Sequence, residues 1–420
     1  MIGKKIDGIE VSNAVKNILK NAVEKLKSEN VDLIDSLDRI SFEDILTNIN
    51  LPRWDNSSMD GYALILDESN ESSVKKLKII GEVYPGDDFV PKIKKNSAIK
   101  IMTGAPMPLE ANCVIPKEDI TLIKSNNKSL NYISFDKNIN IGDNIRKKGS
   151  DFNIGEKIIS KGEKIRSFDV AKLAANGISN IKVYKKPIIS IISTGNELIT
   201  PGDKLKPFTI YDSNALTIAS LVKSVGGIPK IVGIAKDAIR SIESILRESI
   251  NSDAIICTAG VSVGDRDYIK EVIKEHGKIS FWSVNIQPGK PFLYGYVQGR
   301  GKNIPFFGLP GNPVSTIVLM IKFVFPSLLN MQGLINYQPN ITSAILNDQI
   351  KNHSRRNMFA RVKVERIEGQ LIATPFQNNS SHILSSFDNS NGLANVPENC
   401  KILKKGANVE IEIFDNEILL

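Results

Sequence analysis

The sequence is poor in the residues from which many catalytic and metal centres are built. Its 420 residues include 3 cysteines and 3 histidines. Cys113, Cys257 and Cys400 lie far apart and form no CxxC pair, which argues against a structural zinc site or a disulfide framework. None of the histidines lies in the glycine-rich turns considered below, so no nucleophilic triad is evident. A GxxxxGK sequence followed by Ser or Thr is also missing, which disfavours a P-loop ATPase.

Long apolar segments are equally scarce. No uninterrupted apolar run approaches the roughly 20 residues that a membrane-spanning helix needs. The first residues, Met1–Asp7, lack the apolar core of a signal peptide. We therefore expect no membrane segment and a cytoplasmic location. The hydrophobic content of 41% is ordinary for a globular protein, and the length predicts several domains.

The chain is basic, with a formal net charge of +8 from 54 Lys and Arg residues and 46 Asp and Glu residues. Such a charge favours an anionic partner or simply keeps the protein soluble. The lysines are scattered in short pairs, and neither an RNP-like aromatic pattern nor a zinc finger accompanies them. We therefore expect a small anionic substrate rather than a nucleic acid.

The first part of the chain predicts helices that flank a β-rich insertion. Apolar residues at helical spacing indicate an amphipathic helix over Val11–Lys27, and a second, short helix is expected over Ser36–Leu46. From about residue 76 to residue 136 short strands alternate with turns, as in Ser97–Ile101. A helix over Arg166–Asn176 follows this insertion.

From residue 187 onward, strands and helices alternate. The expected strands are Ile188–Ser193, Lys230–Ile234, Asp253–Cys257, Pro291–Tyr296 and Ile304–Phe307. The expected helices are Asn214–Val225, Asp237–Ile250, Asp267–His276 and Pro313–Leu329. This alternation predicts a mostly parallel sheet covered by helices. From about Asn336 the pattern becomes strand-like again, which indicates a separate C-terminal β domain.

Three polar or glycine-rich turns follow strands of the predicted parallel sheet. They are Thr194–Leu198, Thr258–Asp267 and Gly308–Ser315. Ligands of open parallel sheets bind at the carboxyl ends of the strands, so these turns predict a binding crevice. In the second turn Gly260 and Gly264 allow close backbone approach, and Ser262 adds a hydroxyl beside amides that suit an anion. In the third turn Asn312 is a natural helix cap before a proline.

The charged residues around this crevice suit a phosphorylated ligand with a metal ion. Lys290 lies in a proline-bounded turn and is suited to an oxyanion, although a solvated loop lysine has the same pattern. Glu197, Asp237 and Asp267 are carboxylates near strand ends or helix starts. They are either ordinary caps and ion-pair partners or ligands of Mg²⁺, which prefers oxygen ligands shared with phosphates.

Motifs along nearly the whole chain resemble those of the molybdopterin molybdenumtransferases, the MoeA family that is related to the E domain of gephyrin. The matching stretches, in family order, are Asp55–Ala63 (DNSSMDGYA), Thr103–Pro106, Asn144–Arg146 with Gly149 and Asp151, Ser193–Leu198, Asp212–Asn214, Ala259–Gly264 with Asp267, Pro288–Pro291 and Gly308–Ser315 (GLPGNPVS). MDGYA and GLPGNP are quite specific when they occur together. The glycine-serine turn alone is shared with molybdopterin-binding adenylyltransferases.

The resemblance implies a multidomain fold with a central three-layer α/β molybdopterin-binding domain. It places a first helix in residues 1–30, packed on the α/β domain, and a helical linker domain in residues 31–52 and 145–184. It assigns residues 53–144 to the inserted β-rich domain, 185–332 to the α/β domain and 333–420 to a C-terminal β domain of barrel-like form. The family forms an elongated homodimer in which the inserted domain of one subunit faces the α/β domain of the other.

The implied activity is the last step of molybdenum cofactor synthesis. Adenylylated molybdopterin and molybdate bind, the phosphoanhydride is cleaved with Mg²⁺, and AMP leaves. The implied catalytic residues are Asp60, Glu197, Asp237, Asp267 and Lys290, of which Glu197, Asp237 and Asp267 would hold the metal. The implied substrate-binding residues are Thr103, Arg146, Thr194, Gly195, Asp212, Gly260, Ser262, Gly264, Pro310, Gly311, Asn312 and Ser315. Neither a nucleic acid nor a membrane is an expected partner. A transient contact with the molybdopterin adenylyltransferase is expected.

Two rival functions share parts of this pattern. A molybdopterin adenylyltransferase would use the same α/β fold, but the inserted domain and the C-terminal domain argue against it. A non-catalytic molybdopterin-binding scaffold is opposed by the acids retained in every motif. The chain departs from the family pattern at Ala259, where a glycine is usual, and at Gln287, where a Lys or Arg is frequent. The segment Ser380–Ser386 matches the family only loosely.

Overall fold

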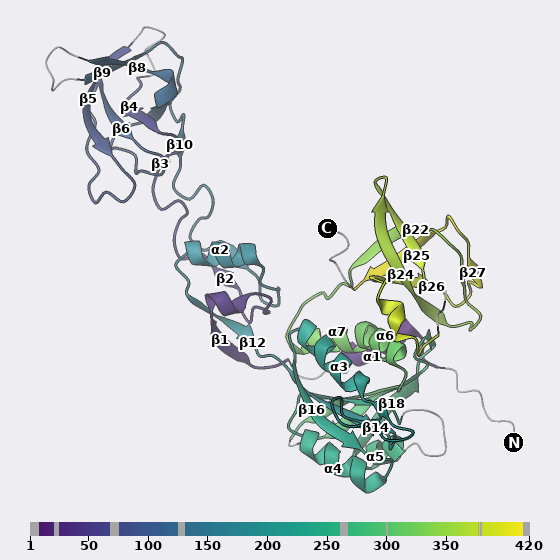
Figure 1. Cartoon of the computed structure of the whole chain (residues 1–420). Helices are drawn as coiled ribbons and strands as arrows, with labels where there is room; N and C mark the ends of the chain where they lie inside the picture. The colour runs from purple at the N-terminus through teal and green to yellow at the C-terminus, as the bar shows by residue number, and fades with distance from the viewer. Residues whose placement is uncertain are drawn as a thin grey trace.

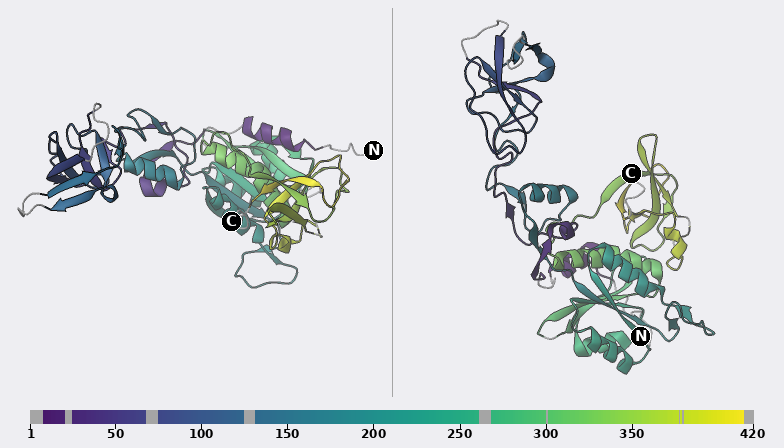
Figure 2. Two further views of the ribbon diagram at one scale, coloured as in Figure 1. Left: turned by 90° about the horizontal axis from the view of Figure 1, so that it is seen from above. Right: turned by 60° about the vertical axis from the view of Figure 1, so that its left-hand side comes forward.

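The computed structural model describes residues 8–20, 25–67, 75–124, 131–260, 268–299, 301–376, 378 and 380–414. The chain forms an elongated molecule in which a β-rich unit lies at one end and the α/β domain lies at the other (Figure 1). A small unit of short strands and one helix joins the two ends, and a C-terminal β domain lies beside the α/β domain (Figure 2).

The α/β domain is built on a six-stranded sheet whose strand order is β16-β13-β17-β21-β20-β18. Its strands are β13 (Ile188–Thr194), β16 (Ile228–Ala235), β17 (Ala254–Thr258), β18 (Gly277–Ser283), β20 (Pro291–Gln298) and β21 (Asn303–Leu309). Strands β16, β13, β17 and β21 are parallel, whereas β20 and β18 run antiparallel to their neighbours. The mostly parallel sheet is thus confirmed, with two antiparallel strands at one edge.

The antiparallel edge follows from the short connection between β20 and β21. Gln298 pairs with Asn303, so only a few residues separate the two strands, and a parallel pairing would need a long crossover. Strand β18 was not predicted, because Gly277–Ser283 directly continues the preceding helix in a sequence with little turn punctuation.

Helices cover both faces of this sheet and make it the middle of three layers (Figure 1). The helices are α1 (Val11–Lys20), α3 (Ser213–Ser224), α4 (Ile239–Ser249), α5 (Tyr268–His276), α6 (Pro313–Leu319) and α7 (Phe325–Met331). Apolar residues of α1, α3, α6 and α7 share one core with the sheet, and those of α4 and α5 share the other. Helix α1 is therefore part of the α/β domain's packing although it opens the chain.

The stretch Pro313–Met331 is one continuous helical segment with a π-helical turn at Met320–Val324. Within the described residues it is the one helix long and apolar enough to cross a membrane by length and composition. In this structure 78% of an 18-residue window of the segment is buried inside the protein. Val318, Leu319 and Leu328 are fully buried in the core that the segment shares with the sheet. Packing against the sheet thus accounts for its apolar character.

The structure of the small joining unit contradicts one prediction. The expected helix over Ser36–Leu46 is wrong: a 3₁₀ turn ends at Ser36, and β2 (Ile45–Leu46) follows. Asp38 between them has φ 63°, which interrupts any helix. Ile40 instead bridges to Lys164, so tertiary β pairing prevails over the helical spacing of the apolar residues.

The same unit contains β1 (Ser28–Asp32) paired with β12 (Asn180–Tyr184), and α2 (Ser167–Ala175). The predicted helix over Arg166–Asn176 is therefore confirmed. Asp169 of α2 accepts hydrogen bonds from the backbone and the side chain of Arg166, so it closes the first turn of the helix.

Six strands form the inserted sheet, in the order β7-β4-β6-β5-β9-β8. They are β4 (Gly61–Leu64), β5 (Lys75–Val83), β6 (Ser97–Ile101), β7 (Cys113–Pro116), β8 (Thr121–Lys124) and β9 (Asn131–Phe135). Gly61 is required at the start of β4, because a Cβ atom there would lie 2.0 Å from the backbone oxygen of Ile115. This glycine of the MDGYA motif therefore has a packing role.

The C-terminal domain is a closed barrel. Its strands β22 (Ile341–Leu346), β24 (Asn357–Ile367), β25 (Gln370–Pro375), β26 (Gly392–Val396) and β28 (Asn408–Ile413) pair in the order β24-β25-β22-β28-β26. A further pairing between β26 and β24 closes the ring. Short β19 (Ile286–Gln287) pairs with β24 and joins the barrel to the segment that leads into β20. The barrel-like form implied by the resemblance is thus confirmed.

Candidate active site

The three predicted turns leave neighbouring strands at one edge of the central sheet. Ser193 of β13 pairs with Thr258 of β17, and Thr258 pairs with Leu309 of β21. Each of these residues lies at or next to the carboxyl end of its strand. The turns that follow them therefore begin side by side, at the edge where parallel α/β sheets bind ligands.

Asn214 links the second and third turns to each other. Its Nδ2 donates hydrogen bonds to Thr258 Oγ1 at 3.0 Å and to the backbone oxygen of Gly311 at 2.8 Å. The residue that precedes α3, Asp212, accepts a hydrogen bond from the Ala215 amide at 3.1 Å. Asp212 is thus a buried helix cap that positions Asn214, and its carboxylate faces its own helix.

The turns after β13 and β16 each carry a carboxylate and contact each other. Glu197 lies so near Gly195 that a Cβ on this glycine would be 2.7 Å from both carboxylate oxygens. The Asn196 amide lies 3.4 Å from Asp237 Oδ2, and Asn196 Oδ1 accepts a hydrogen bond from the Asp237 amide at 3.3 Å. Glu197 and Asp237 are both exposed, and they lie on turns that these two contacts join.

The side-chain oxygens of these turns are of the type that binds a magnesium ion. The carboxylate oxygens of Glu197 and Asp237 are the ligand type that Mg²⁺ prefers. Thr194 Oγ1 is buried there and has no hydrogen-bond partner among the described residues. A Cβ added to Gly260 would lie 2.9 Å from this hydroxyl, so the second turn passes directly over it. Three residues predicted for the site, Ser262, Gly264 and Asp267, lie outside the described residues.

A cleft of about 650 Å³ opens between this sheet edge and the C-terminal barrel. Its α/β wall contains the predicted residues Gly260, Lys290, Pro310, Gly311, Asn312 and Ser315. The Lys290 turn is held in place, because the Lys290 backbone oxygen accepts a hydrogen bond from the Val284 amide at 3.1 Å. The Lys290 side chain itself is exposed and can turn toward a bound anion.

The opposite wall comes from the barrel, and reasoning from the sequence missed it. It consists of Arg356, Ser380, Ser381 and His382. Asn312 Nδ2 donates a hydrogen bond to Ser381 Oγ at 3.0 Å, and the Val314 amide donates one to the Ser381 backbone oxygen at 3.2 Å. The barrel loop is therefore attached to the start of α6. The cleft thus contains Lys290, Arg356 and a histidine, which together suit an oxyanion.

A buried arginine supports this barrel loop from behind. Arg361 on β24 has no exposed surface, and its Nη2 donates to the backbone oxygens of Asn378 at 3.1 Å and Ser380 at 3.3 Å. Its Nε has no partner among the described residues. Burial lowers the pKa of Arg361 to about 10, so the guanidinium remains charged at neutral pH. The one sequence signal was an arginine inside the apolar stretch Met358–Val364.

A second cleft of about 510 Å³ adjoins the first and shares Gln287 and Ser380 with it. Its other walls come from the barrel, including Phe376 and Lys351. Gln287 Oε1 is buried where the clefts meet and has no partner among the described residues. The family departure at Gln287 therefore places an unpaired amide oxygen, instead of a cation, beside the first cleft.

Asp60 and Thr103 contact each other, but not the cleft. Asp60 Oδ1 accepts hydrogen bonds from the Thr103 amide at 2.9 Å and the Thr103 hydroxyl at 2.8 Å, and Oδ2 lies 3.3 Å from Lys117 Nζ. The Thr103 hydrogen bonds and the nearby lysine lower the pKa of Asp60 to about 2. Arg146 is exposed on β10 (Ile145–Arg146), which pairs with β3 (Asn56–Ser57) of the same unit.

Within one chain, the inserted sheet lies at the far end of the molecule from the cleft (Figures 1 and 2). The predicted site residues that the structure describes therefore fall into two groups. Asp60, Thr103 and Arg146 form one group, and the residues of the sheet edge and Lys290 form the other. One chain does not bring the two groups together.

Comparison with known proteins finds three family models that match successive parts of the chain. Residues 9–177 match the family described as the MoeA N-terminal region (domain I and II). Residues 190–330 match a probable molybdopterin binding domain, and residues 343–414 match the MoeA C-terminal region (domain IV).

Relatives match over nearly their whole length. The molybdopterin molybdenumtransferase of Haemophilus influenzae is 32% identical over 393 residues, which cover 93% of this chain and 95% of that protein. The enzyme of the same name from Staphylococcus epidermidis is 29% identical over 422 residues, 98% of each chain. The crystal structure of the molybdopterin biosynthesis moea protein from Pyrococcus horikosii has a TM-score of 0.80 and 31% identity, and covers 97% of this chain and 100% of that one. With the motifs, all three domains and these relatives in agreement, the chain belongs to the MoeA family.

Proposed function

We propose that this protein inserts molybdenum from molybdate into adenylylated molybdopterin and releases AMP, the last step of molybdenum cofactor biosynthesis. The observation that carries the proposal is the cleft between the α/β sheet edge and the C-terminal barrel. Lys290 lies on its α/β wall, and Arg356 and His382 lie on its barrel wall. The exposed carboxylates of Glu197 and Asp237 lie on turns at the same edge of the sheet. Relatives that align over nearly the whole chain are named molybdopterin molybdenumtransferases.

The proposed role of each residue follows from the charge or polarity of its side chain or backbone. Lys290 and Arg356 would hold the oxyanion, because both basic side chains lie on the cleft wall. Arg361 would keep the barrel loop with Ser380 and Ser381 in position, through its hydrogen bonds to the backbone. The amides and the hydroxyl around Gly311, Asn312 and Ser315 would receive the anionic pterin substrate at the start of α6.

We propose that Glu197, Asp237 and Asp267 hold Mg²⁺ at the sheet edge. The bound ion supplies Lewis-acid stabilisation of the charge that develops on the phosphoanhydride as AMP leaves. The Asn196–Asp237 contacts hold two of these turns together, which supports a shared site. Asp267→Asn should then bind the adenylylated pterin but release AMP poorly. AMP release at the wild-type rate by this variant would remove Asp267 from the metal site.

A homodimer is part of the proposal. Within one chain Asp60 and Thr103 lie at the far end from the cleft, yet Asp60 is held charged by Thr103. A second subunit could present this charged group to the cleft. We also propose a cytoplasmic location and a transient contact with the molybdopterin adenylyltransferase that supplies the substrate.

The central experiment measures AMP release from adenylylated molybdopterin with molybdate and Mg²⁺. AMP release that needs both molybdate and enzyme is expected. A parallel reaction with ATP and molybdopterin tests the first alternative, because a molybdopterin adenylyltransferase would release pyrophosphate there. A scaffold would bind the pterin and release neither AMP nor pyrophosphate. Pyrophosphate release, or binding alone, would thus replace the proposal with one of these two functions. Repeating the assay with tungstate identifies the preferred oxyanion.

A further inference from the structure

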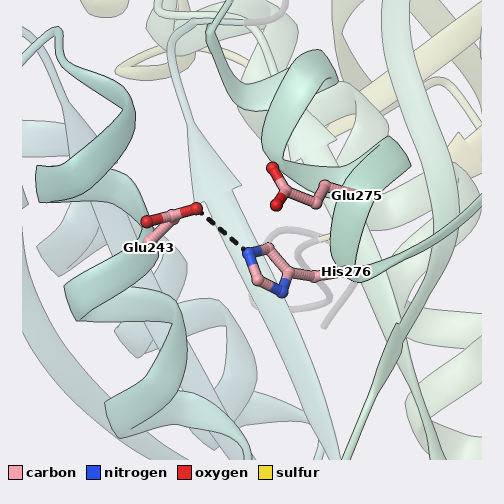
Figure 3. A group of neighbouring side chains, drawn as sticks. All are labelled: Glu243, Glu275 and His276. Carbon is pink, nitrogen blue, oxygen red and sulfur yellow. Dashed lines mark hydrogen bonds and ion pairs between the residues drawn. The ribbon is translucent and has the colours of Figure 1, made fainter.

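A histidine and two glutamates gather between α4 and α5, which cover one face of the sheet. Glu243 comes from α4, and Glu275 and His276 form the end of α5 (Figure 3). One ligand atom from each of the three residues lies within 4.8 Å of the other two. His276 Nε2 and Glu243 Oε1 are 3.2 Å apart.

This cluster is separate from the active-site cleft. Helix α5 starts beyond the Thr258–Asp267 turn at the ligand-binding edge of the sheet, and its nine residues carry the chain roughly 13 Å away from that edge. None of the three side chains lines the cleft. A ligand at this position would therefore act through α4 and α5, and not as part of the proposed magnesium site.

The charges of the cluster are unbalanced. Two carboxylates converge on one imidazole, and two like charges at this spacing repel each other unless a cation lies between them. The neighbouring Arg247 balances them poorly, because its Nη2 is 3.9 Å from the second oxygen of Glu243 and its side chain is 74% exposed. Glu243 itself is largely buried, with 18% of its side chain exposed, so water screens its charge only in part.

The spacing of the ligand atoms suits a tetrahedral ion. Zinc bonds of 2.0–2.1 Å place neighbouring ligand atoms about 3.3 Å apart. The 3.2 Å between His276 Nε2 and Glu243 Oε1 already corresponds to one edge of such a tetrahedron. Glu275 is exposed and its carboxylate can rotate into the third position, while water takes the fourth.

We propose that Glu243, Glu275 and His276 bind one divalent transition-metal ion of the zinc type, which links α4 to α5. An imidazole with two carboxylates favours Zn²⁺ or Co²⁺ over Mg²⁺, because Mg²⁺ prefers oxygen ligands in octahedral geometry. Both helices also contribute to one apolar core on this face of the sheet. The bound ion would therefore stabilise the α/β domain without entering the reaction.

The test is titration of the full-length, metal-free protein with ZnSO₄ by calorimetry, in the presence of excess Mg²⁺. One equivalent of Zn²⁺ should bind with micromolar affinity. Glu243→Gln, Glu275→Gln and His276→Gln should each weaken this binding at least tenfold. Glu271→Gln is the matched control, since Glu271 is exposed on the same helix outside the cluster, and it should leave the affinity unchanged.

Two further readouts separate a built site from unspecific surface binding. Bound Co²⁺ should give the intense visible absorption of tetrahedral coordination, and Glu275→Gln should abolish it. Zn²⁺ should raise the Tm of the wild type but not that of His276→Gln, with equal metal-free Tm values for both. Equal zinc affinity in the wild type and all three cluster variants would overturn the proposal, as would an octahedral cobalt spectrum.

Discussion

Ala259 stands where the family usually has a glycine, and its backbone conformation should be strained. The substitution Ala259→Gly should relieve this strain. Ala259 has φ 69° and the following Gly260 has φ 68°, so both residues adopt the left-handed conformation. An L-residue with a Cβ pays roughly 1–2 kcal/mol for this conformation. A glycine loses more conformational entropy on folding than an alanine, which lowers the free energy of unfolding by about 0.5–1 kcal/mol. Ala259→Gly should therefore stabilise the protein by about 0.5–1 kcal/mol.

The Ala259 side chain offers little packing to set against this gain. The residue is half-buried, and its Cβ lies 3.6 Å from where a Cβ on Gly311 would be, which is an ordinary contact distance. The hydrogen bond from the Ala259 amide to the Leu309 oxygen, 2.9 Å long, uses the backbone and should survive the substitution. The Tm of the α/β domain should rise by about 1–4 °C.

Calorimetric unfolding measures this shift, and Ala407→Gly serves as its control. Ala407 is also half-buried and outside helices and strands, but it is not among the residues with positive φ. The same substitution there should lower stability, because only the entropy cost remains. Opposite signs at the two positions are the expected result. A fall in Tm at both positions would show that the left-handed turn stores no strain at Ala259.

Two other substitutions test charges in the site. Lys290→Ala should weaken molybdate binding by about tenfold to a hundredfold, because a charge-assisted contact contributes roughly 1.5–3 kcal/mol, and Lys290→Arg should restore only part of it. Calorimetric titration at two salt concentrations measures the change, and an unchanged affinity would make Lys290 a solvated surface charge. Asp60 should titrate near pH 2 by carbon-13 NMR, and Thr103→Val should move its pKa toward the ordinary 3.8. Because the folded pKa is lowered, the stabilisation from Asp60 is present above pH 3.8 and is lost as the pH falls through about 2. A wild-type midpoint near 3.8 would contradict the hydrogen bonds from Thr103.

Sequence patterns predicted those parts of the fold that local periodicity determines. Strand β17 (Ala254–Thr258) is apolar throughout and is fully buried, so its pattern and its environment agree. The Ser36–Leu46 segment failed because apolar spacing alone does not show that Ile40 pairs with Lys164, far away in the chain. Strand β18 was not predicted because a strand that directly continues a helix leaves little turn signal.

The candidate site was predictable on one side only. Glycine-rich turns after strands identify the α/β wall, because parallel strands place their carboxyl ends at one edge. The barrel wall depends on how two domains pack, and the contact between Asn312 and Ser381 spans 69 residues of sequence. Sequence spacing therefore contained no sign that His382 would line the same cleft as Lys290. Arg361 showed itself only as a charge in an apolar strand, which indicates burial but no partner.

The separation of Asp60 from the cleft allows the shared-site dimer to be tested by complementation. Suppose that each active site combines Lys290 of one subunit with Asp60 of the other. Homodimers of Asp60→Asn and of Lys290→Ala are then both impaired at every site. A mixed dimer has one site with both substitutions and one site with neither. Random exchange makes about half of the dimers mixed, so about one quarter of wild-type AMP release should return. If each chain instead completes its own site, every site in the mixture carries one substitution and no activity returns. Light scattering must first show a dimer at micromolar concentration, and a monomer alone would already exclude the shared cleft.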